Sequence, residues 1–165
     1  MYYYDEFGKE FEDELSFHEY LEEIDERAKW IRVPSRSLSV LTVSGHEVLM
    51  PDIENVDMKD LLADTKKHSG LLLQFPERMY PLGKTAVSTL KDRARIKGTA
   101  LMDVKKTVLA DILNECLQVS KGEALLRISE GKVRGVLSGD EADYAIISMP
   151  KLFMIASAYI SGDHN

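Results

Sequence analysis

Two runs rich in leucine, isoleucine and valine stand on either side of Glu130-Gly131, and this pattern constrains the fold more than any other. Residues 124–129 and 132–138 are each long enough for one strand. Strands joined by a two-residue turn that ends in glycine are typical of an antiparallel hairpin. We therefore predict a hairpin over 124–138, which needs a second layer to bury its apolar face.

The register predicted for this hairpin places two arginines opposite each other. A two-residue turn places Arg127 opposite Arg134, on the face that also carries Lys132. Like charges directly opposite each other destabilise a sheet. Water, a carboxylate such as Asp140, or a phosphate held by both guanidinium groups would offset them. A bulge at Gly131 would instead separate the two arginines.

The remaining sequence predicts helices and strands that do not alternate strictly. A further hairpin is predicted around Ser44-Gly45. The helical patterns cover 17–29, 58–68, 84–95, 103–118 and 150–160, and the strand patterns cover 38–43, 46–50, 71–75 and 144–148. Such an order predicts an α+β fold: an acidic N-terminal helix, two β-hairpins and a short mixed sheet packed against three to four helices. We expect a single domain over 31–165, preceded by an arm over 1–30.

The arm carries almost all the negative charge of the chain. Residues 1–30 hold 11 acidic and 3 basic residues, a net charge of −8, whereas the whole chain has −7. Ser16 and Glu19 fit a capping box at the start of the predicted helix 17–29. An acidic surface of this kind repels, masks or imitates a polyanion. The acidic residues expected to contact a partner are Glu12, Asp13, Glu14, Glu19, Glu22, Glu23, Asp25 and Glu26.

The body of the chain contains a basic stretch over 84–106, with a net charge of +5. Its start, Gly83-Lys84-Thr85, resembles the end of a phosphate-binding P-loop. That loop also needs a glycine where Arg78 stands, so a plain helix start is the favoured interpretation. We expect phosphate contact without base readout, or a solvated surface. The candidate residues for binding an anion or nucleic acid are Lys91, Arg93, Arg95, Lys97, Arg127, Lys132 and Arg134.

The sequence offers no catalytic set and no cofactor motif. The four histidines lack the spacing of metal ligands, and Cys116 falls on the apolar stripe of a predicted helix. The acidic loop of Asp140, Glu141 and Asp143 is the residual candidate for a metal-dependent nuclease. A single cysteine and the absence of a signal peptide or a long apolar run favour a reducing, cytoplasmic setting, away from membranes.

The second half of the chain resembles a known family. The features are Tyr80-Pro-Leu-Gly-Lys-Thr-Ala, Arg93-Ala-Arg-Ile-Lys-Gly, Leu113-Asn114, Leu126-Arg-Ile-Ser-Glu-Gly-Lys-Val-Arg-Gly-Val-Leu-Ser138, Tyr144 and Leu152-Phe153. In this order they resemble the phage/plasmid-like family of domain of unknown function 932, over about residues 80–153. The resemblance implies a mobile element in bacteria and supplies no catalytic residues. Members usually continue beyond the position of Asn165, so the resemblance implies either a shortened member or a piece trimmed from a longer one.

Three functions follow as expectations. The first is a non-enzymatic accessory protein of a phage or plasmid, which binds nucleic acid or a complex that handles nucleic acid. The second is an acidic inhibitor of a host defence nuclease, which imitates DNA through the 1–30 arm as anti-CRISPR proteins do. The third and weakest is the nuclease noted above. The partner would be a protein or nucleic-acid complex of the host or phage, and a homo-oligomer stays open.

Overall fold

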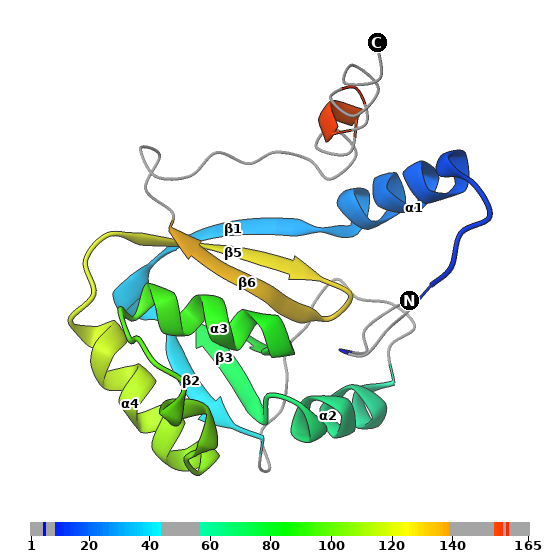
Figure 1. The fold of residues 1–165 in the computed structure, drawn as a ribbon. Coiled ribbons are helices and arrows are strands. Elements are labelled where there is room, and N and C mark those ends of the chain that lie inside the picture. The colour runs from blue at the N-terminus through cyan, green and yellow to red at the C-terminus, as the bar shows by residue number, and fades with distance from the viewer. Residues whose placement is uncertain (1–4, 6–8, 44–56, 139–153, 157, 159–165) are drawn as a thin grey trace. The chain divides into compact units, whose positions relative to one another are not determined.

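The computed structural model describes residues 5, 9–43, 57–138, 154–156 and 158 (Figure 1). The chain divides into two compact units, which are described separately. The first comprises residues 1–7 and 29–144, and the second comprises residues 8–28 and 145–165.

Within the described part of the first unit, six strands form two antiparallel three-stranded sheets. The order β1-β5-β6 joins β1 (Lys29–Pro34), β5 (Glu123–Ser129) and β6 (Lys132–Ser138), and the order β2-β3-β4 joins β2 (Ser39–Thr42), β3 (Leu71–Phe75) and β4 (Arg78–Pro81). A parallel bridge between Leu82 and Val133 connects the two sheets just after β4. The predicted α+β architecture is therefore confirmed, with its strands in two small sheets.

Three α-helices and two short 3₁₀ turns complete the described part of this unit. They are α2 (Met58–Lys67), α3 (Lys84–Arg93), α4 (Lys106–Gln118), η1 (Ser35–Ser37) and η2 (Ala100–Asp103). The predicted helix start at Lys84 and the N-cap at Asp57 are confirmed, since the Asp57 carboxylate accepts from the N–H groups of Lys59 and Asp60. The buried core contains Leu73 and Tyr80 from the β2-β3-β4 sheet, Leu90 and Leu113 from α3 and α4, and Leu126 from β5.

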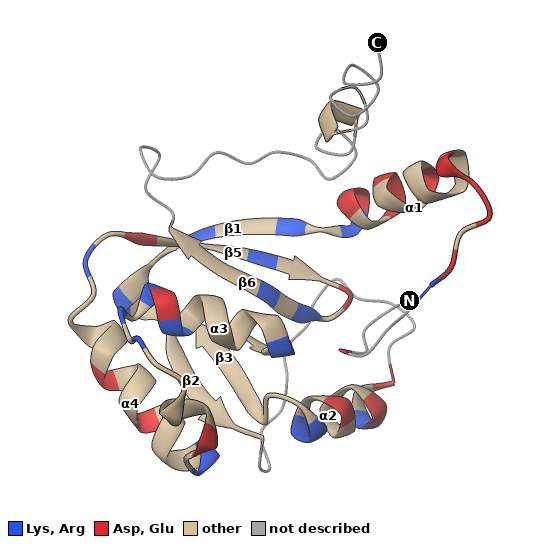
Figure 2. Cartoon of the chain, viewed as in Figure 1, with Lys and Arg blue, Asp and Glu red and all other residues tan. Residues whose placement is uncertain are grey.

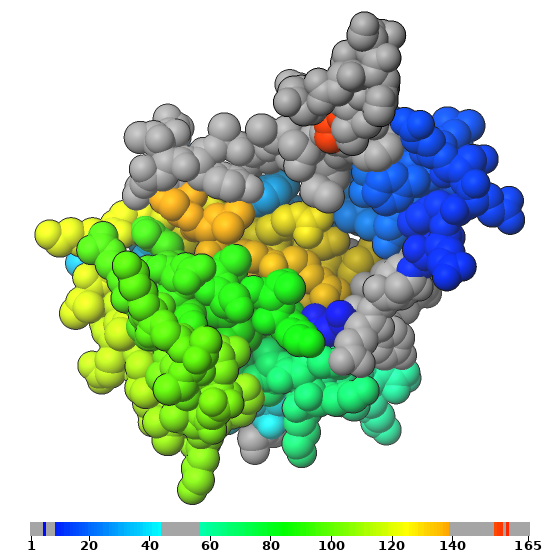
Figure 3. Space-filling model, viewed as in Figure 1, coloured from blue at the N-terminus to red at the C-terminus, as the bar shows by residue number. Residues whose placement is uncertain are grey.

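Helix side chains satisfy the outer edges of two strands. α3 lies along β6, where Thr89 Oγ1 accepts a hydrogen bond from the Val136 N–H at 2.9 Å. α4 does the same for β2: the amide of Asn114 accepts from the Val40 N–H at 2.6 Å and donates to the Val40 carbonyl at 2.9 Å. Strand edges left open promote pairing with other chains, so these contacts also close the fold. Figure 3 shows α3, in green, packed directly beside β6, in orange.

The 124–138 hairpin is confirmed, but its register differs from the prediction. Glu130 and Gly131 have φ angles of 52° and 81°, as a two-residue type I′ turn requires. Ile128 pairs with Val133 as predicted. The register then shifts by one, so Arg127 pairs with Gly135 instead of Arg134. Arg134 is therefore the extra residue of a β-bulge, which removes the opposition of two like charges.

Two strands were not predicted. β1 lies between the predicted helix 17–29 and the predicted strand 38–43, and it pairs with β5 along its whole length. β4 lies between the predicted strand 71–75 and the predicted helix 84–95, where Pro76 and Pro81 favour a loop, and it pairs with β3. A proline is tolerated at the end of a strand, which is where Pro34 and Pro81 lie. The predicted helix 103–118 begins later, at Lys106, after η2.

In the second unit, α1 (Glu14–Arg27) is capped differently from the prediction. Asp13, not Ser16, is the N-cap: its carboxylate accepts from the Ser16 N–H at 2.7 Å, and this hydrogen bond lowers the pKa of Asp13. The helix therefore begins three residues before the predicted 17–29 segment. Phe11 packs against Phe17 and Tyr20 with ring centroids 5.2 and 5.0 Å apart, which ties the chain before the helix to it.

Several predictions fall wholly or partly outside the described residues. They are the strands 46–50 and 144–148, the Asp140, Glu141 and Asp143 loop, and most of the helix 150–160. Residues 154–156 and 158 are helical.

The Asn114 amide yields the first testable prediction. We expect Asn114→Ala to lower the free energy of unfolding by about 1–3 kcal/mol, because it leaves the N–H and carbonyl of Val40 without their partner. The measurement is urea unfolding followed by circular dichroism. Gln118→Ala on the same helix is the matched control, since Gln118 is exposed and makes one long contact of 3.4 Å. Equal losses in the two variants would contradict the edge-closing role.

Candidate functional site

Five charged or titratable side chains meet where three segments of the first unit converge. Lys132 lies at the start of β6, Arg134 two residues later at the bulge, and Asp64 and His68 lie one turn apart at the end of α2. Asp5 comes from the N-terminal segment. We refer to Asp5, Asp64, His68, Lys132 and Arg134 as the Asp5 cluster.

The ammonium of Lys132 is the centre of the Asp5 cluster. Its side chain has 0% exposure, and Nζ lies 3.0 Å from Asp5 Oδ2 and 2.5 Å from Asp64 Oδ2. The two carboxylates are 3% and 9% exposed. Arg134 Nη1 donates to Asp5 Oδ1 at 3.0 Å. A buried ammonium costs several kcal/mol to desolvate, and two carboxylates in direct contact offset that cost.

Backbone groups complete the environment of the two carboxylates. The Lys84 N–H, at the first turn of α3, donates to Asp5 Oδ1 at 3.1 Å. The Asp5 N–H donates to Asp64 Oδ2 at 3.1 Å. Asp5 thus satisfies a donor that every helix leaves open at its N-terminus, where negative charge is also favoured.

The pKa values of Asp64 and Arg134 are set by two opposing effects, burial and the contacts with opposite charges. Burial raises the pKa of Asp64. The hydrogen bonds from Lys132 and the Asp5 N–H, together with the charges of Lys132 and His68, lower the pKa by more than burial raises it. The net pKa of Asp64 is therefore below its usual range. Burial lowers the pKa of Arg134, while the carboxylates of Asp5 and Glu130 act in the opposite direction. Asp64 is therefore ionised at neutral pH.

Part of the Asp5 cluster has the composition of a metal site. Carboxylate oxygens of Asp5 and Asp64 and a ring nitrogen of His68 lie within 4.8 Å of one another, which is suitable for one divalent ion. Lys132 already places a positive charge against both carboxylates. The arrangement therefore neutralises its acids with a lysine, and a metal would have to displace that ammonium.

The predicted anion-binding residues do not form one site, and of the seven only Lys132 and Arg134 meet at a common partner, Asp5. Arg93 donates to Ser35 Oγ and to the carbonyls of Lys121 and Glu123 at 2.8–3.1 Å, which clamps the end of α3 to the start of β5. Lys91 donates to the Gly98 carbonyl. Lys132 and Arg134 belong to the Asp5 cluster. Arg95 and Lys97 are exposed in the segment that follows α3.

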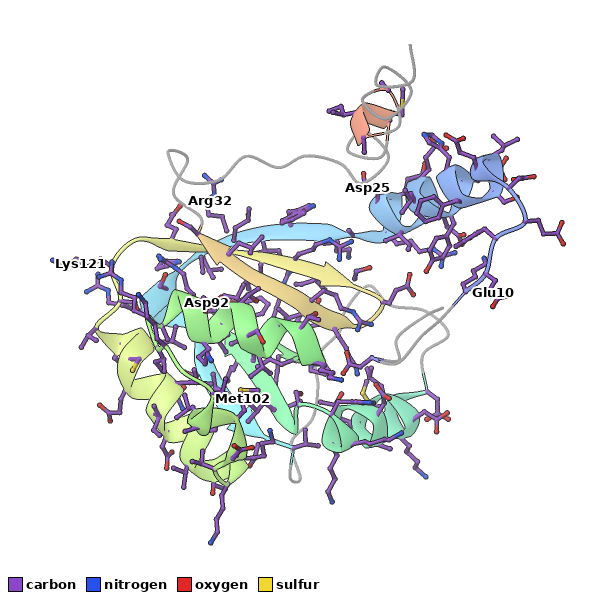
Figure 4. All side chains as sticks on the ribbon, in the orientation of Figure 1. Glu10, Asp25, Arg32, Asp92, Met102 and Lys121 are labelled. Carbon is purple, nitrogen blue, oxygen red and sulfur yellow. The ribbon has the colours of Figure 1, made fainter. Side chains whose placement is uncertain are left out.

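Arg127 lies instead beside an aromatic residue that the sequence interpretation missed. It pairs with Trp30 on β1 and with Gly135 on β6, so these three residues form one row across the sheet. Directly paired residues project to the same face. Arg32, two residues after Trp30, shares that face, and Figure 4 shows its side chain on the side of the sheet away from α3. We call Trp30, Arg32, Arg127 and Gly135 the outer sheet face.

Gly135 is a buried residue within the outer sheet face. Its φ is not in the left-handed region, so the backbone does not require glycine there. A Cβ at this position would meet its nearest described atoms, in Arg127 and Leu137, only at 4.0 Å. A groove of about 480 Å³ also runs along β1, lined by Trp30, Ile31, Arg32, Val33, Phe75, Pro76, Glu77 and Arg78. The room for a ligand therefore lies in the groove along β1, beside the indole of Trp30 and the guanidinium groups of Arg32 and Arg78.

The predicted partner-binding acids lie on and before α1, in the second unit. Figure 2 shows the acidic residues of α1 in red and the basic residues of β1, β5 and β6 in blue. Asp13 caps the helix and Glu23 pairs with Arg27. Asp25 and Glu23 are partly buried, and the remaining acids of the set are exposed: Glu12, Glu14, Glu19, Glu22 and Glu26.

No family model, curated protein or solved structure matches this chain. Among the described residues, no helix is long and apolar enough to cross a membrane.

Both sites depend on residues far apart in the sequence. Asp5 and Lys132 are separated by 127 residues in the sequence. Trp30 and Arg127 lie on β1 and β5, which are neighbours in the sheet but far apart in the sequence. The spacing of Asp64 and His68, one helical turn apart, was the one local signal available for the Asp5 cluster.

The burial of Lys132 yields the second prediction. We expect Lys132→Met to lower the free energy of unfolding by about 3–5 kcal/mol, because it removes the lysine counter-charge of the buried Asp64 carboxylate and leaves Asp5 with Arg134 alone. The measurement is urea unfolding at pH 7. The matched control is Lys66→Met on the exposed side of α2, for which about 0.5 kcal/mol or less is expected. A Lys132→Met cost no larger than that of the control would contradict the account.

Proposed function

We propose that this chain is a non-enzymatic protein that binds single-stranded nucleic acid through its outer sheet face. The observation that carries the proposal is the row of Trp30, Arg127 and Gly135 across three strands. Bases stack on aromatic side chains with about 1–3 kcal/mol each and little sequence preference, because every base presents a π-face. An indole on a sheet that lines an open groove suits such stacking.

Guanidinium groups around the indole supply the contacts to phosphate. Arg127 is the cross-strand neighbour of Trp30, Arg32 lies two residues along β1, and Arg78 lines the groove at the edge of the same strand. Planar guanidinium groups bind phosphate oxygens in pairs and also stack on bases. Binding by three arginines implies a modest salt dependence, with a slope of about −2 in a plot of log K against log salt.

The same proposal places the protein in a bacterial mobile element. The resemblance of residues 80–153 to the phage/plasmid-like family supports this origin, and with it the cytoplasm of the host as the place of action. The absence of enzymatic activity is part of the proposal, because the described carboxylates of the Asp5 cluster are engaged with Lys132 and Arg134.

The third prediction tests the outer sheet face. We expect Trp30→Ala to weaken binding of a fluorescent oligothymidine by about tenfold or more, through loss of one stacked base. We expect Arg127→Gln to reduce the salt slope by about 0.7. Fluorescence anisotropy at several salt concentrations measures both effects.

Two further variants make this test specific. Trp30→Phe keeps an aromatic face and should retain most of the affinity, which separates stacking from a loss of fold. Arg36→Gln changes an exposed arginine of η1 and should leave affinity and slope unchanged. Wild-type binding that is absent, or insensitive to Trp30→Ala, would refute the proposed function.

A second candidate function is inhibition of a host nuclease by the acidic helix. The observation that favours it is the series of exposed acids on and before α1, namely Glu12, Glu14, Glu19, Glu22 and Glu26. Carboxylates spaced along a rigid helix present regularly spaced negative charge, as a nucleic-acid backbone does, to a basic groove on a partner.

The fourth prediction separates the two functions. Replacing the five exposed acids by Gln keeps Asp5 and the Asp13 cap in place. If α1 is an inhibitor, this variant loses salt-sensitive capture of a nuclease from host lysate, while binding of oligothymidine is unchanged. If the outer sheet face is the functional surface, Trp30→Ala has the larger effect and neutralising α1 leaves oligothymidine binding intact.

A further inference from the structure

We propose that the Asp5 cluster is a binding site for a terminal phosphate group, and that the carboxylate of Asp5 occupies this site as an autoinhibitory contact. The inference rests on the proposed function, since the phosphate would be the end of the bound nucleic acid. It concerns a different part of the molecule from the outer sheet face, so the two can fail independently.

Three donors from two elements, α3 and β6, converge on Asp5, and each of them can bind an anion. The Lys84 N–H at the start of α3 and Arg134 Nη1 both donate to Oδ1, at 3.1 and 3.0 Å. Lys132 Nζ donates to Oδ2 at 3.0 Å. A lysine with 0% exposure is held within this set, so the position is built into the interior and does not depend on surface side chains alone.

Gly83 provides the room for that anion. Its φ of −68° is open to any residue, so the backbone does not explain the glycine. A Cβ at Gly83 would lie 3.2 Å from Asp5 Oδ1 and 3.2 Å from the Val133 carbonyl, closer than ordinary contact. The sequence Gly83-Lys84-Thr85 therefore performs a task like that of a P-loop end by another route: a helix start and two cationic side chains replace the glycine-rich nest.

Charge identifies the preferred ligand. Without Asp5, the pocket holds the positive charges of Lys132 and Arg134, the negative charge of Asp64 and roughly half a positive charge at the helix N-terminus. The sum is about +1.5, which matches the charge of about −1.5 to −2 on a phosphate monoester. A phosphodiester within a strand carries less charge and is flanked by sugars on both sides, so it does not reach the buried Lys132. A terminal phosphate does.

Asp5 competes with such a ligand because it is attached to the same chain. An intramolecular group acts at a high effective concentration, in the millimolar range for a short tether. Removing its carboxylate should therefore reveal phosphate binding that the wild-type protein suppresses. Displacement of the Asp5 carboxylate from its three donors by the ligand would be the corresponding event in the intact protein.

The fifth prediction uses the full chain with Asp5→Ala. We expect this variant to unfold at a lower temperature than wild type in chloride, and inorganic phosphate at equal ionic strength to restore several degrees of the loss. Asp57→Ala is the matched control: it also removes an aspartate that caps a helix start, but at α2, where Lys132 and Arg134 are absent. Its melting temperature should not respond specifically to phosphate.

Binding of an oligothymidine with a 5′-phosphate or a 5′-hydroxyl tests the source of the phosphate. We expect Asp5→Ala to prefer the phosphorylated strand by about tenfold or more, since charge-assisted hydrogen bonds contribute 1.5–3 kcal/mol each. The preference should be smaller in wild type and lost in Asp5→Ala combined with Arg134→Gln. Asp5→Asn, which keeps the shape of the side chain, replaces Asp5→Ala in both measurements if the alanine variant does not fold.

The outcomes separate this inference from the proposed function. A phosphate response of Asp5→Ala no larger than that of Asp57→Ala overturns the anion site. Equal affinity of Asp5→Ala for the phosphorylated and the hydroxyl oligothymidine overturns the terminal-phosphate ligand. If Trp30→Ala also loses affinity for oligothymidine, binding at the outer sheet face is still supported. If no variant binds either oligothymidine, the proposed function and the terminal-phosphate ligand both fail. The effect of inorganic phosphate on the melting temperature of Asp5→Ala then shows by itself whether the pocket accepts phosphate.

Discussion

The ammonium of Lys132, held between Asp5 and Asp64, is the interaction on which the rest of the described fold depends. Its burial is acceptable only if both carboxylates arrive, so α2 must dock for Asp64 and the N-terminal segment must dock for Asp5. The bulge of β6 then aims Arg134 at the other oxygen of Asp5, whose carboxylate also satisfies the start of α3. One buried cation thereby links segments separated by up to 127 residues, and it penalises any arrangement that leaves one of them out.

This interaction divides the acidic arm into parts with different roles. Asp5 is an internal counter-charge, whereas Glu12, Glu14, Glu19, Glu22 and Glu26 are exposed in the second unit. Removing residues 1–30 as a block would therefore delete an acid that Lys132 requires and the indole of Trp30, along with the acids on α1. A loss of binding in such a deletion has three explanations. Point substitutions are the informative test, because each changes one of these features.

Local sequence signals predicted the elements whose reasons are local. The Glu130-Gly131 turn, the Asp57 cap and the helix start at Lys84 depend on a few adjacent residues, and all three are confirmed. β1 and β4 were missed because prolines next to short apolar runs look like loops until a partner strand is known. The burial of Lys132 was missed because a lysine beside a turn is expected at the surface, and only Asp5 and Asp64, distant in sequence, make the interior acceptable. The register error arose from one residue, since nothing local to Arg134 reveals that Asp5 will attract it.

The bulge at Arg134 explains how one strand serves two surfaces. In an unbroken register Arg134 would face Arg127 on the outer sheet face, where two guanidinium groups would repel each other. The extra residue turns Arg134 towards Asp5 and places the buried Gly135 beside Arg127 in the Trp30 row. β6 thus contributes Lys132 and Arg134 to the Asp5 cluster and Gly135 to the outer sheet face within four residues. A nucleic-acid strand whose terminal phosphate entered the Asp5 cluster would contact both surfaces along β6. Binding at one surface would then raise the effective concentration of the strand at the other.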